Sequence, residues 1–370
     1  MTPLEKYKRD LMRPDFIFDA AQEHAVLALQ RLFDDLMLVS DKPINLGLWA
    51  KFKLLSSGAE TSTTGQVKGV YFWGGVGRGK TYLVDTFYDC LPFENKMRIH
   101  FHRFMYRVHQ ELRGLEQQKN PLEIVAKRFA DEAKIICFDE FFVSDITDAM
   151  ILGTLFEALF SHQVILVATS NIIPDELYRN GLQRSRFLPT IALINKNCEI
   201  VNVDSGVDYR LRTLEQAEIY HCPLDSAAQA NLEQYFQQLS CEPRNYHNAI
   251  NIENRQIRAL AEADSVLMID FVELCGGPRS QLDYMEISRI YHTVLLANVT
   301  QMGKDSDDMT RRFIAMVDEF YERNVTLIMS AEVEMTALYN SGRLAFEFRR
   351  CLSRLQEMQS HDYLAREHLP

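Results

Sequence analysis

The sequence has no apolar stretch long enough to cross a membrane and no cysteine pair spaced for a metal or redox site. No apolar run approaches the roughly 20 residues that a membrane-spanning helix needs. The seven cysteines are scattered along the chain without a C-x-x-C pair. Such a set favours reduced thiols over a disulfide framework or a zinc site. These absences argue against the membrane-spanning, disulfide-rich and zinc-binding classes of protein.

The chain also lacks an excess of basic residues. Its 40 lysines and arginines are outnumbered by 51 acidic residues, for a formal net charge of −11. This balance makes nucleic acid an improbable partner, although a local basic groove would still be compatible with it. Residues 1–10 carry two acids and no apolar core, so they resemble neither a secretory signal nor a transit peptide. We therefore expect a cytoplasmic protein.

A glycine-rich stretch at residues 74–81 has the sequence GGVGRGKT and fits the pattern G-x-x-x-x-G-K-[ST]. It lies between an apolar run at 69–73, typical of a buried strand, and a segment of helical periodicity at 82–88. In this context glycines let backbone N–H groups surround phosphate oxygens, and the helix N-terminus adds its positive dipole end. The pattern therefore predicts a nucleoside triphosphate site formed by Gly74, Gly75, Val76, Gly77, Arg78, Gly79, Lys80 and Thr81.

Two residues of this P-loop have separate predicted roles. Lys80 should reach the β- and γ-phosphates, and the hydroxyl of Thr81 should bind Mg²⁺. The alternative is a glycine-rich turn with an incidental lysine. The flanking strand and helix favour the nucleotide site over that alternative.

A second nucleotide signature occurs where the apolar run 135–138 is followed by Asp139 and Glu140. We predict that Asp139 contributes to the Mg²⁺ shell and that Glu140 polarises the attacking water as the general base. An Asp-Glu pair after a strand is often just a solvated turn. Its place downstream of the P-loop, beyond an intervening strand predicted over 97–102, favours the catalytic interpretation and hydrolysis over binding alone.

Three further polar residues are candidates for the same site. The apolar run 164–168 leads to Asn171, whose amide would orient the water and sense the γ-phosphate. The alternative is a helix cap, because Pro174 opens the next helix. Arg184 and Arg186 end a short helix, and either could reach the γ-phosphate of a neighbouring subunit as an arginine finger. The alternative for both is a solvated basic turn.

Strand–helix alternation over about 69–205 predicts an α/β fold, a P-loop NTPase (AAA+-like) parallel sheet flanked by helices. We expect a helix over 15–38, capped near its start by Asp19. The polar segment 56–67 predicts a mobile loop. The expected domains are an N-terminal helical segment at 1–55, an ATPase core at 66–212, and a C-terminal mixed α/β region at 213–370 that packs on or extends the core.

A helix–strand pair late in the chain echoes residues 147–170. Phe160, Val164 and Tyr178 have counterparts at the same offsets in Tyr321, Val325 and Tyr339. One echo is too little to establish a repeat.

The order of these motifs resembles that of the AFG-like ATPases. The resemblance rests on the P-loop, the C-F-D-E-F run around Asp139, and distinctive runs at 98–102 (R-I-H-F-H), 181–184 (G-L-Q-R) and 311–314 (R-R-F-I). It covers nearly the whole chain. The polar insertion at 56–67 and Cys351, in a late arginine-rich run, depart from the family pattern.

The resemblance implies an AAA+-type ATPase of the cytoplasm that uses ATP and Mg²⁺ and forms a homo-oligomer. For the bacterial branch it implies a role in cell division, lowering the stability of FtsZ polymers when ATP is present. Carried over to this chain, the ATPase residues are Lys80, Thr81, Asp139 and Glu140, the sensor is Asn171, and the finger is Arg184 or Arg186.

Other functions have less support from the residues. A GTPase would need a guanine-reading N-K-x-D, and the nearest match, N-K-N-C at 195–198, lacks the acid. A loader or accessory factor for a nucleic-acid or protein-quality-control machine is the main alternative, since similar ATPase cores serve there. A small-molecule kinase is the third class, and no lid with clustered arginines is evident near the P-loop.

Overall fold

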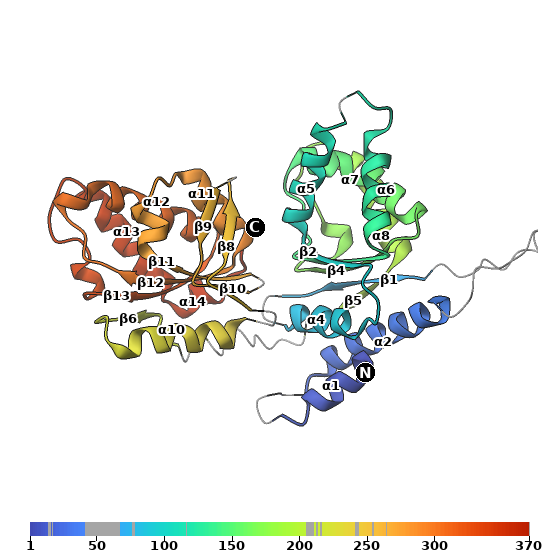
Figure 1. Ribbon diagram of the computed structural model, residues 1–370, viewed down its shortest axis with the longest axis horizontal. Coiled ribbons are helices and arrows are strands. Elements are labelled where there is room, and N and C mark those ends of the chain that lie inside the picture. The colour runs from blue at the N-terminus through green and yellow to red at the C-terminus, as the bar shows by residue number, and fades with distance from the viewer. Residues whose placement is uncertain are drawn as a thin grey trace, which may run out of the picture. The chain divides into compact units, whose positions relative to one another are not determined.

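The computed structural model describes residues 1–13, 16, 18–40, 67–75, 78–115, 117–204, 211, 214, 217–240, 244–253, 255–263 and 265–369. The chain forms two compact units, Met1–Val207 and Asp208–Pro370 (Figure 1). The predicted domain boundaries at 55/66 and 212/213 fall outside the described residues, as do most of the predicted loop at 56–67 and two P-loop residues, Val76 and Gly77.

The first unit is built around a five-stranded sheet in the order β2-β3-β4-β1-β5. Its strands are β1 (Gly69–Trp73), β2 (Lys96–His100), β3 (Ile135–Asp139), β4 (Ile165–Ser170) and β5 (Cys198–Asn202). All neighbouring strands are parallel, so their carboxyl ends meet at one edge. This confirms the predicted parallel α/β fold, and the order places β4 between β3 and β1.

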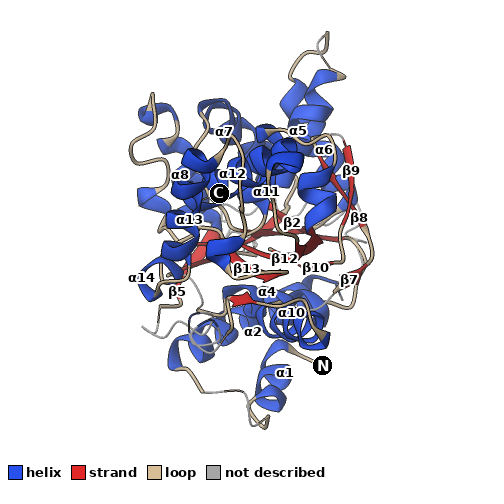
Figure 2. Ribbon diagram, turned by 90° about the vertical axis from the view of Figure 1, so that its left-hand side faces the viewer, coloured by secondary structure: helices blue, strands red, loops and turns tan. Residues whose placement is uncertain are grey.

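Helices cover both faces of this sheet, and the strands lie between helical layers (Figures 1 and 2). One face carries α5 (Phe101–Arg113), α6 (Pro121–Glu132), α7 (Ile146–Ser161) and α8 (Leu188–Asn197). The other carries α1 (Pro3–Asp10), α2 (Ala20–Ser40) and α4 (Lys80–Cys90). The 3₁₀ turns η1 (Pro174–Glu176) and η2 (Arg184–Arg186) join β4 to α8. Each layer therefore has its own apolar core, one on each side of the sheet.

The N-terminal helical segment contains two helices among its described residues. The helix α1 begins with Pro3 and a capping box between Thr2 and Glu5. The helix α2 begins at Ala20, later than predicted, because the carboxylate of Asp19 accepts two N–H groups of the first turn at 2.8 and 3.4 Å. The predicted role of Asp19 as a cap is thus confirmed, and it sets the start of the helix.

The strand predicted over 97–102 is shorter in the structure. It ends at His100, and Phe101 begins α5. The ring of Phe101 is buried against Phe138 and Phe141, with ring centroids 5.6 and 4.4 Å apart. Packing of this ring into the core therefore turns the chain into a helix at a point where the apolar alternation suggested a continuing strand.

The second unit contains a six-stranded mixed sheet in the order β6-β13-β12-β11-β10-β7. Its strands are β6 (Tyr220–His221), β7 (Asn245–Tyr246), β10 (Ala261–Ala263), β11 (Val266–Asp270), β12 (Thr293–Val299) and β13 (Thr326–Ala331). The hairpin β8 (Ala249–Ile252) and β9 (Arg255–Arg258) adds a separate two-stranded sheet. The sequence did not predict β6 to β10, because these strands are too short to show a clear period.

Helices again lie on both faces of this sheet (Figure 1). One face carries α11 (Gln281–Ile290), α12 (Asp307–Glu322) and α13 (Ala345–Met358), and the other carries α10 (Ser226–Leu239). Shorter elements complete the unit: a π-helical turn η3 (Val272–Gly276), the 3₁₀ turns η4 (Lys304–Ser306) and η5 (Met335–Ala337), and α14 (His361–Leu364). The predicted C-terminal mixed α/β region is therefore confirmed in its fold class.

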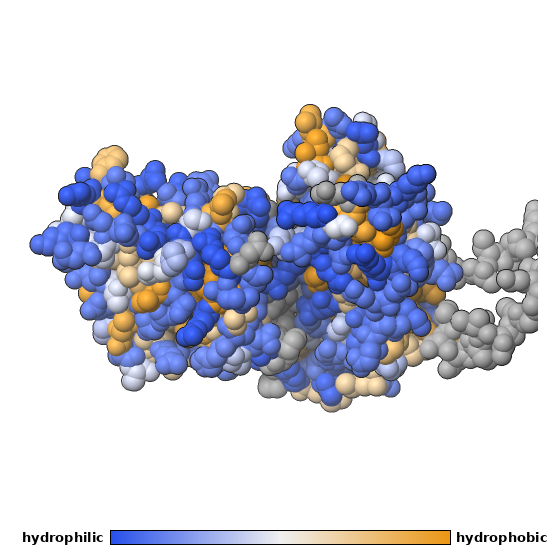
Figure 3. All heavy atoms as spheres, turned by 45° about the horizontal axis from the view of Figure 1, so that its top comes forward, coloured by the Kyte–Doolittle hydropathy of each residue, from blue (hydrophilic) through white to orange (hydrophobic). Residues whose placement is uncertain are grey.

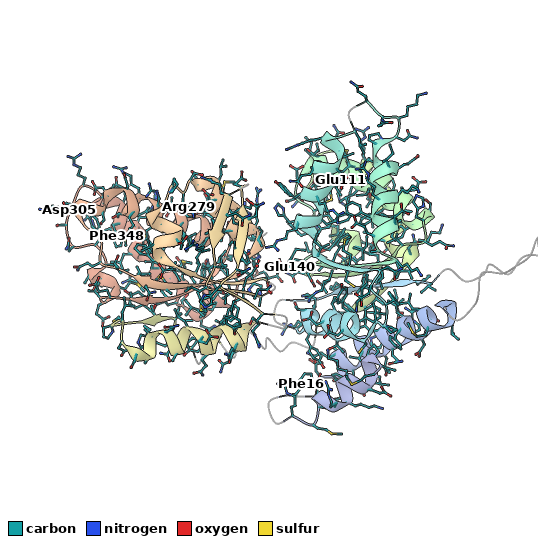
Figure 4. All side chains as sticks on the ribbon, viewed as in Figure 1. Phe16, Glu111, Glu140, Arg279, Asp305 and Phe348 are labelled. Carbon is teal, nitrogen blue, oxygen red and sulfur yellow. The ribbon has the colours of Figure 1, made fainter. Side chains whose placement is uncertain are left out.

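Part of the first unit recurs in the second at an offset of 161 residues, which relates α7, β4 and η1 to α12, β13 and η5. The ring pairs Tyr178–Phe187 and Tyr339–Phe348 recur at the same offset, with centroids 5.6 and 5.2 Å apart; Phe348 is labelled in Figure 4. The hydroxyls of Thr169 and Ser330 each accept a backbone N–H from the end of the neighbouring strand, at 3.1 and 3.0 Å. The sequence echo therefore extends to a structural repeat.

The surface carries exposed apolar side chains at dispersed positions, among them Leu27, Leu182 and Phe346. On the face drawn in Figure 3, apolar residues form separate small areas within a mostly hydrophilic surface. Across the described part of the chain, no helix combines the length and apolar character that a membrane crossing requires.

Candidate functional site

The loop between β1 and α4 encloses the side chain of Lys80. The ammonium donates hydrogen bonds to the carbonyl oxygens of Gly74 and Gly75 at 2.6 and 2.7 Å. It also donates to Oδ1 of Asn171 at 2.8 Å. Lys80 therefore joins the P-loop to the carboxyl end of β4, the strand next to β1.

Two glycines of the loop are required by its backbone. Gly74 has φ +150° and Gly79 has φ +78°, a region that side-chain-bearing residues rarely adopt. A Cβ atom on Gly79 would lie 2.5 Å from Nε2 of Gln22, and one on Gly74 would lie 3.0 Å from the amide nitrogen of Asp204. At these two positions the loop therefore presents backbone without a side chain, next to the N-terminus of α4. This arrangement favours anion binding.

The two other described residues of the motif differ in their surroundings. Arg78 is held by an ion pair between its Nε and Oδ1 of Asp204, 2.9 Å apart, and its side chain is largely buried. Thr81 lies in the first turn of α4 and is partly exposed. Thr81 therefore follows Lys80 at the start of α4, while Arg78 is tied to Asp204, which follows β5.

Asp139 and Glu140 lie at the carboxyl end of β3. The carboxylate of Asp139 is 5% exposed and accepts a hydrogen bond from Nε of Arg98 at 2.8 Å. Arg98 also pairs with Asp85 of α4. Glu140 has φ +51°, and its N–H donates to Oγ1 of Thr169 at 3.1 Å. This left-handed backbone fixes the direction in which the side chain leaves the end of the strand, and Asn298, which makes the corresponding hydrogen bond in the second unit, shares it with φ +61°; Glu140 is labelled in Figure 4.

The strand order places Asn171 between the P-loop and the acidic pair. The register of β4 on β1 brings the carboxyl ends of the two strands level. The backbone directly after Asn171 is fixed by Tyr71, whose hydroxyl donates a hydrogen bond to the carbonyl oxygen of Ile172 at 2.9 Å. Burial raises the pKa of Tyr71 above its ordinary value, so the phenol stays protonated as a donor. The structure therefore brings Lys80, Asn171 and the ends of β1, β3 and β4 together at one edge.

Arg184 and Arg186 do not join this cluster. The guanidinium of Arg184 donates to the carbonyl of Asp175 at 2.6 Å, and that of Arg186 donates to Oε1 of Gln183 at 3.1 Å. Arg186 is exposed, whereas Arg184 is partly buried. Among the described residues, neither guanidinium contacts Lys80 or the two acids of β3, and each is bonded within its own segment.

The sequence reasoning missed Arg98, which bridges two carboxylates of the site. The side chains of Arg98, Asp85 and Asp139 are 16%, 12% and 5% exposed, so their charges interact with little screening by water. The three residues come from β2, α4 and β3. No local pattern could have paired them, although Arg98 opens the R-I-H-F-H run singled out in the sequence.

Replacing Arg98 by methionine should lower the free energy of unfolding of the first unit by about 3–5 kcal/mol, because two largely buried carboxylates lose the guanidinium that bridges them. Urea unfolding followed by tryptophan fluorescence would measure this, since Trp73 ends β1 in the first unit and the sequence of the second unit contains no tryptophan. The matched control is Arg128→Met, which breaks a more exposed pair with Glu111 and should cost less than about 1 kcal/mol. Equal losses in the two variants would contradict the bridging role.

The corresponding position in the second unit differs in its chemistry. There β6 lies beside β13, as β1 lies beside β4, and the following helix is α10. Its N-cap Asp225 accepts the N–H groups of Ala227 and Ala228 at 2.9 and 3.1 Å. A carboxylate thus already occupies the helix N-terminus that would attract a phosphate. At this described position the second unit has no counterpart of the phosphate cradle.

Comparisons with known proteins extend over both compact units. The model of the AFG1-like ATPase family matches residues 1–367. Cell division protein ZapE of Escherichia coli K12 is 49% identical over 370 residues, covering 100% of this chain and 99% of that protein. Lactation elevated protein 1 homolog B of Danio rerio is 33% identical over 350 residues, covering 82% of this chain and 70% of that protein. Among solved structures, DnaI is similar at 14% identity with a TM-score of 0.35, covering 50% of this chain and 87% of that chain.

Proposed function

The chain belongs to the AFG1-like ATPase family, and from this premise we propose that it acts in cell division, where ATP hydrolysis destabilises FtsZ polymers. The observation that carries the catalytic part is the contact of Lys80 with both the P-loop and Asn171. The division role is supported by full-length identity of 49% to a protein named for cell division. FtsZ follows from the family resemblance of the motifs, and the cytoplasm is the compartment in which the protein meets it.

ATP fits the loop as its triphosphate ligand, because the backbone at Gly74 and Gly79 leaves no room for a Cβ atom and the N-terminus of α4 faces the loop. Lys80 neutralises charge on the β- and γ-phosphates. Thr81 and Asp139 would hold Mg²⁺, since a hydroxyl and a carboxylate are the hard oxygen ligands that this ion prefers. When bound, Mg²⁺ supplies charge neutralisation across the phosphate oxygens. In the described ranges, no group of three or more His, Cys, Asp or Glu side chains is placed to hold a metal by itself.

Hydrolysis is carried by the side chains at the ends of β3 and β4. Glu140 takes the proton of the attacking water as the general base. Asn171 accepts a hydrogen bond from Lys80 in this structure. When Lys80 turns to the phosphates, the amide of Asn171 is released to orient the water. Asn171 thereby couples the arrival of the γ-phosphate to the placement of the nucleophile, which is the role of a sensor.

The site is completed by an arginine from a second copy of the chain, in a homo-oligomer. Two arginines of η2 are candidates, and Arg186 suits the role better than Arg184. Its guanidinium is exposed and bonded to the side chain of Gln183. Arg184 is partly buried and bonded to a backbone carbonyl. Arg186 is therefore the arginine that reaches the γ-phosphate of a neighbour, and Arg184 shapes the turn that presents it.

The division function is tested by recording light scattering of assembled FtsZ and phosphate release in the same cuvette. We expect the scattering to fall when the wild-type protein and ATP are added together. We expect no fall with a non-hydrolysable ATP analogue or with Lys80→Ala, because neither completes the hydrolytic cycle. The fall should follow the rate of phosphate release.

A surface variant controls for non-specific effects of added protein. Lys127→Ala removes an exposed lysine of α6 that pairs with Asp131 of the same helix, and it should behave as the wild type. If phosphate is released while the polymers keep their scattering, FtsZ is not the substrate. A salt-dependent response to single-stranded DNA in the same assay would then favour a nucleic-acid partner.

A further inference from the structure

Gln22, near the start of α2, contacts the P-loop although 56 residues separate it from Arg78. The residue is 5% exposed. Nε2 donates a hydrogen bond to the carbonyl oxygen of Arg78 at 3.2 Å. The same Nε2 lies 2.5 Å from the place of a Cβ atom on Gly79, so this glycine leaves room for the amide.

The oxygen atom of the Gln22 side-chain amide is buried without a hydrogen-bond partner among the described residues. Oε1 of Gln22 is shielded from solvent and has no hydrogen bond to any described residue. A buried polar atom left unpaired is costly, and native structures contain few of them. An open acceptor directly beside a phosphate-binding loop points to a ligand that brings a donor.

The position of Gln22 is fixed by its surroundings. Asp19 caps the helix and accepts the N–H of Gln22 at 3.4 Å. The chain before it is anchored by Phe16, whose ring lies 5.1 Å from that of Tyr82 in α4; Phe16 is labelled in Figure 4. The hydroxyl of Tyr82 donates in turn to Asp10 at 2.8 Å. The amide is therefore held on a packed scaffold that joins α1 and α2 to the helix of the P-loop.

We propose that Gln22 reads the adenine base of the nucleotide and makes the enzyme selective for ATP over GTP. Oε1 accepts a hydrogen bond from the exocyclic N6 amino group, and Nε2 turns from the carbonyl of Arg78 to donate to N7. Adenine presents this donor–acceptor pair on one edge, and a glutamine amide matches it with two hydrogen bonds. Guanine presents O6 in place of the amino group, so Oε1 would face a second acceptor. The proposal rests on ATP binding in the P-loop and adds the recognition of its base.

The competing explanation is that Gln22 only ties α2 to the P-loop. These two roles differ in their dependence on ligand atoms. A purely structural glutamine affects all nucleotides alike, since the phosphates are common to them. The effect of a base-reading glutamine depends on which of the two groups, the N6 amino group and N7, a nucleotide carries.

The experiment measures the dissociation constants of ATP, GTP and 7-deaza-ATP, which lacks the N7 acceptor. For the wild-type protein we expect ATP to bind about 10- to 100-fold more tightly than GTP, and 7-deaza-ATP, which keeps the N6 contact and loses the N7 contact, to bind with intermediate affinity. In Gln22→Leu the affinity for ATP should fall to near that of GTP, 7-deaza-ATP should lose less affinity than ATP because it had only the N6 contact, and GTP should change little. The matched control, Gln30→Leu, removes another hydrogen-bonded glutamine of α2 and should preserve the selectivity.

Two results would overturn the proposal. One is equal binding of the three nucleotides by the wild-type protein, which needs no variant to be observed. The other is a loss of affinity in Gln22→Leu by the same factor for all three, which would assign a structural role. If the wild-type protein binds none of them, the nucleotide site in the P-loop is itself wrong, and that outcome is distinct from a loss of selectivity.

Discussion

Replacing Glu140 by glutamine should lower the rate of ATP hydrolysis about 100- to 10,000-fold while ATP still binds, because the general base is removed and the phosphate cradle is kept. Glutamine has nearly the same shape but cannot accept a proton from water at neutral pH. The strained backbone of Glu140, fixed by the N–H bond to Thr169, should hold the amide where the carboxylate was. The loss should therefore appear in kcat, with little change in the dissociation constant for ATP.

Phosphate release and equilibrium binding of ATP would be measured on the same preparation. The matched control is Glu157→Gln on α7, which changes an exposed glutamate and should leave both quantities unaltered. Normal hydrolysis by Glu140→Gln would show that another group activates the water. A parallel loss of binding would place Glu140 in the nucleotide pocket rather than at the reacting water.

Replacing Arg186 by alanine should lower hydrolysis about a thousandfold under conditions in which the subunits are assembled, as expected for an arginine finger. The reason is electrostatic: charge that develops on the γ-phosphate loses the guanidinium that stabilises it. Stability should change little, because the side chain is exposed and bonded only to Gln183. The control is Arg179→Ala, an exposed arginine nearby whose ion pair with Glu176 lies at the surface.

Mixing two inactive variants tests whether the arginine acts between subunits. Lys80→Ala keeps Arg186 but cannot use its own P-loop, whereas Arg186→Ala keeps the P-loop. A mixed interface can therefore join an intact loop to an intact arginine, and hydrolysis should reappear on mixing. Activity that stays absent in the mixture while the subunits co-assemble would mean that Arg186 does not act in trans. Unchanged activity of Arg186→Ala alone would remove it from the mechanism.

Local patterns predicted much of the first unit. Three features could each be recognised from a few consecutive residues: the apolar run 69–73, the glycines of the P-loop and the acids after 135–138. A loop that binds phosphate through its own backbone consists of consecutive residues, so a sequence pattern can identify it. The predicted strand at 97–102 was wrong at its end, because burial of the Phe101 ring, a tertiary effect, decides where α5 begins.

The second unit was less predictable. Its longer parallel strands and helices are periodic enough to be recognised, whereas β6 and β7 have two residues each and carry no periodic signal. In the sequence, the repeat was visible only as three aromatic or aliphatic residues that recur at the same spacing. Its extent became clear from the matching ring pairs and hydroxyl contacts, because contacts between side chains are preserved where residue identities are not.

The sequence by itself determined that this chain binds and hydrolyses a nucleoside triphosphate, because the phosphate-binding loop and the acidic pair that follows residues 135–138 each consist of consecutive residues, and it placed the chain among the AFG-like ATPases. Only the tertiary structure decided which distant residues serve that loop. The strand order sets Asn171 between Lys80 and the acids, Arg98 comes from β2 to bridge Asp85 and Asp139, and Gln22 approaches from the N-terminal helices. These contacts join residues that are separated along the chain, so their pairing depends on how helices and strands pack and no local pattern can encode it.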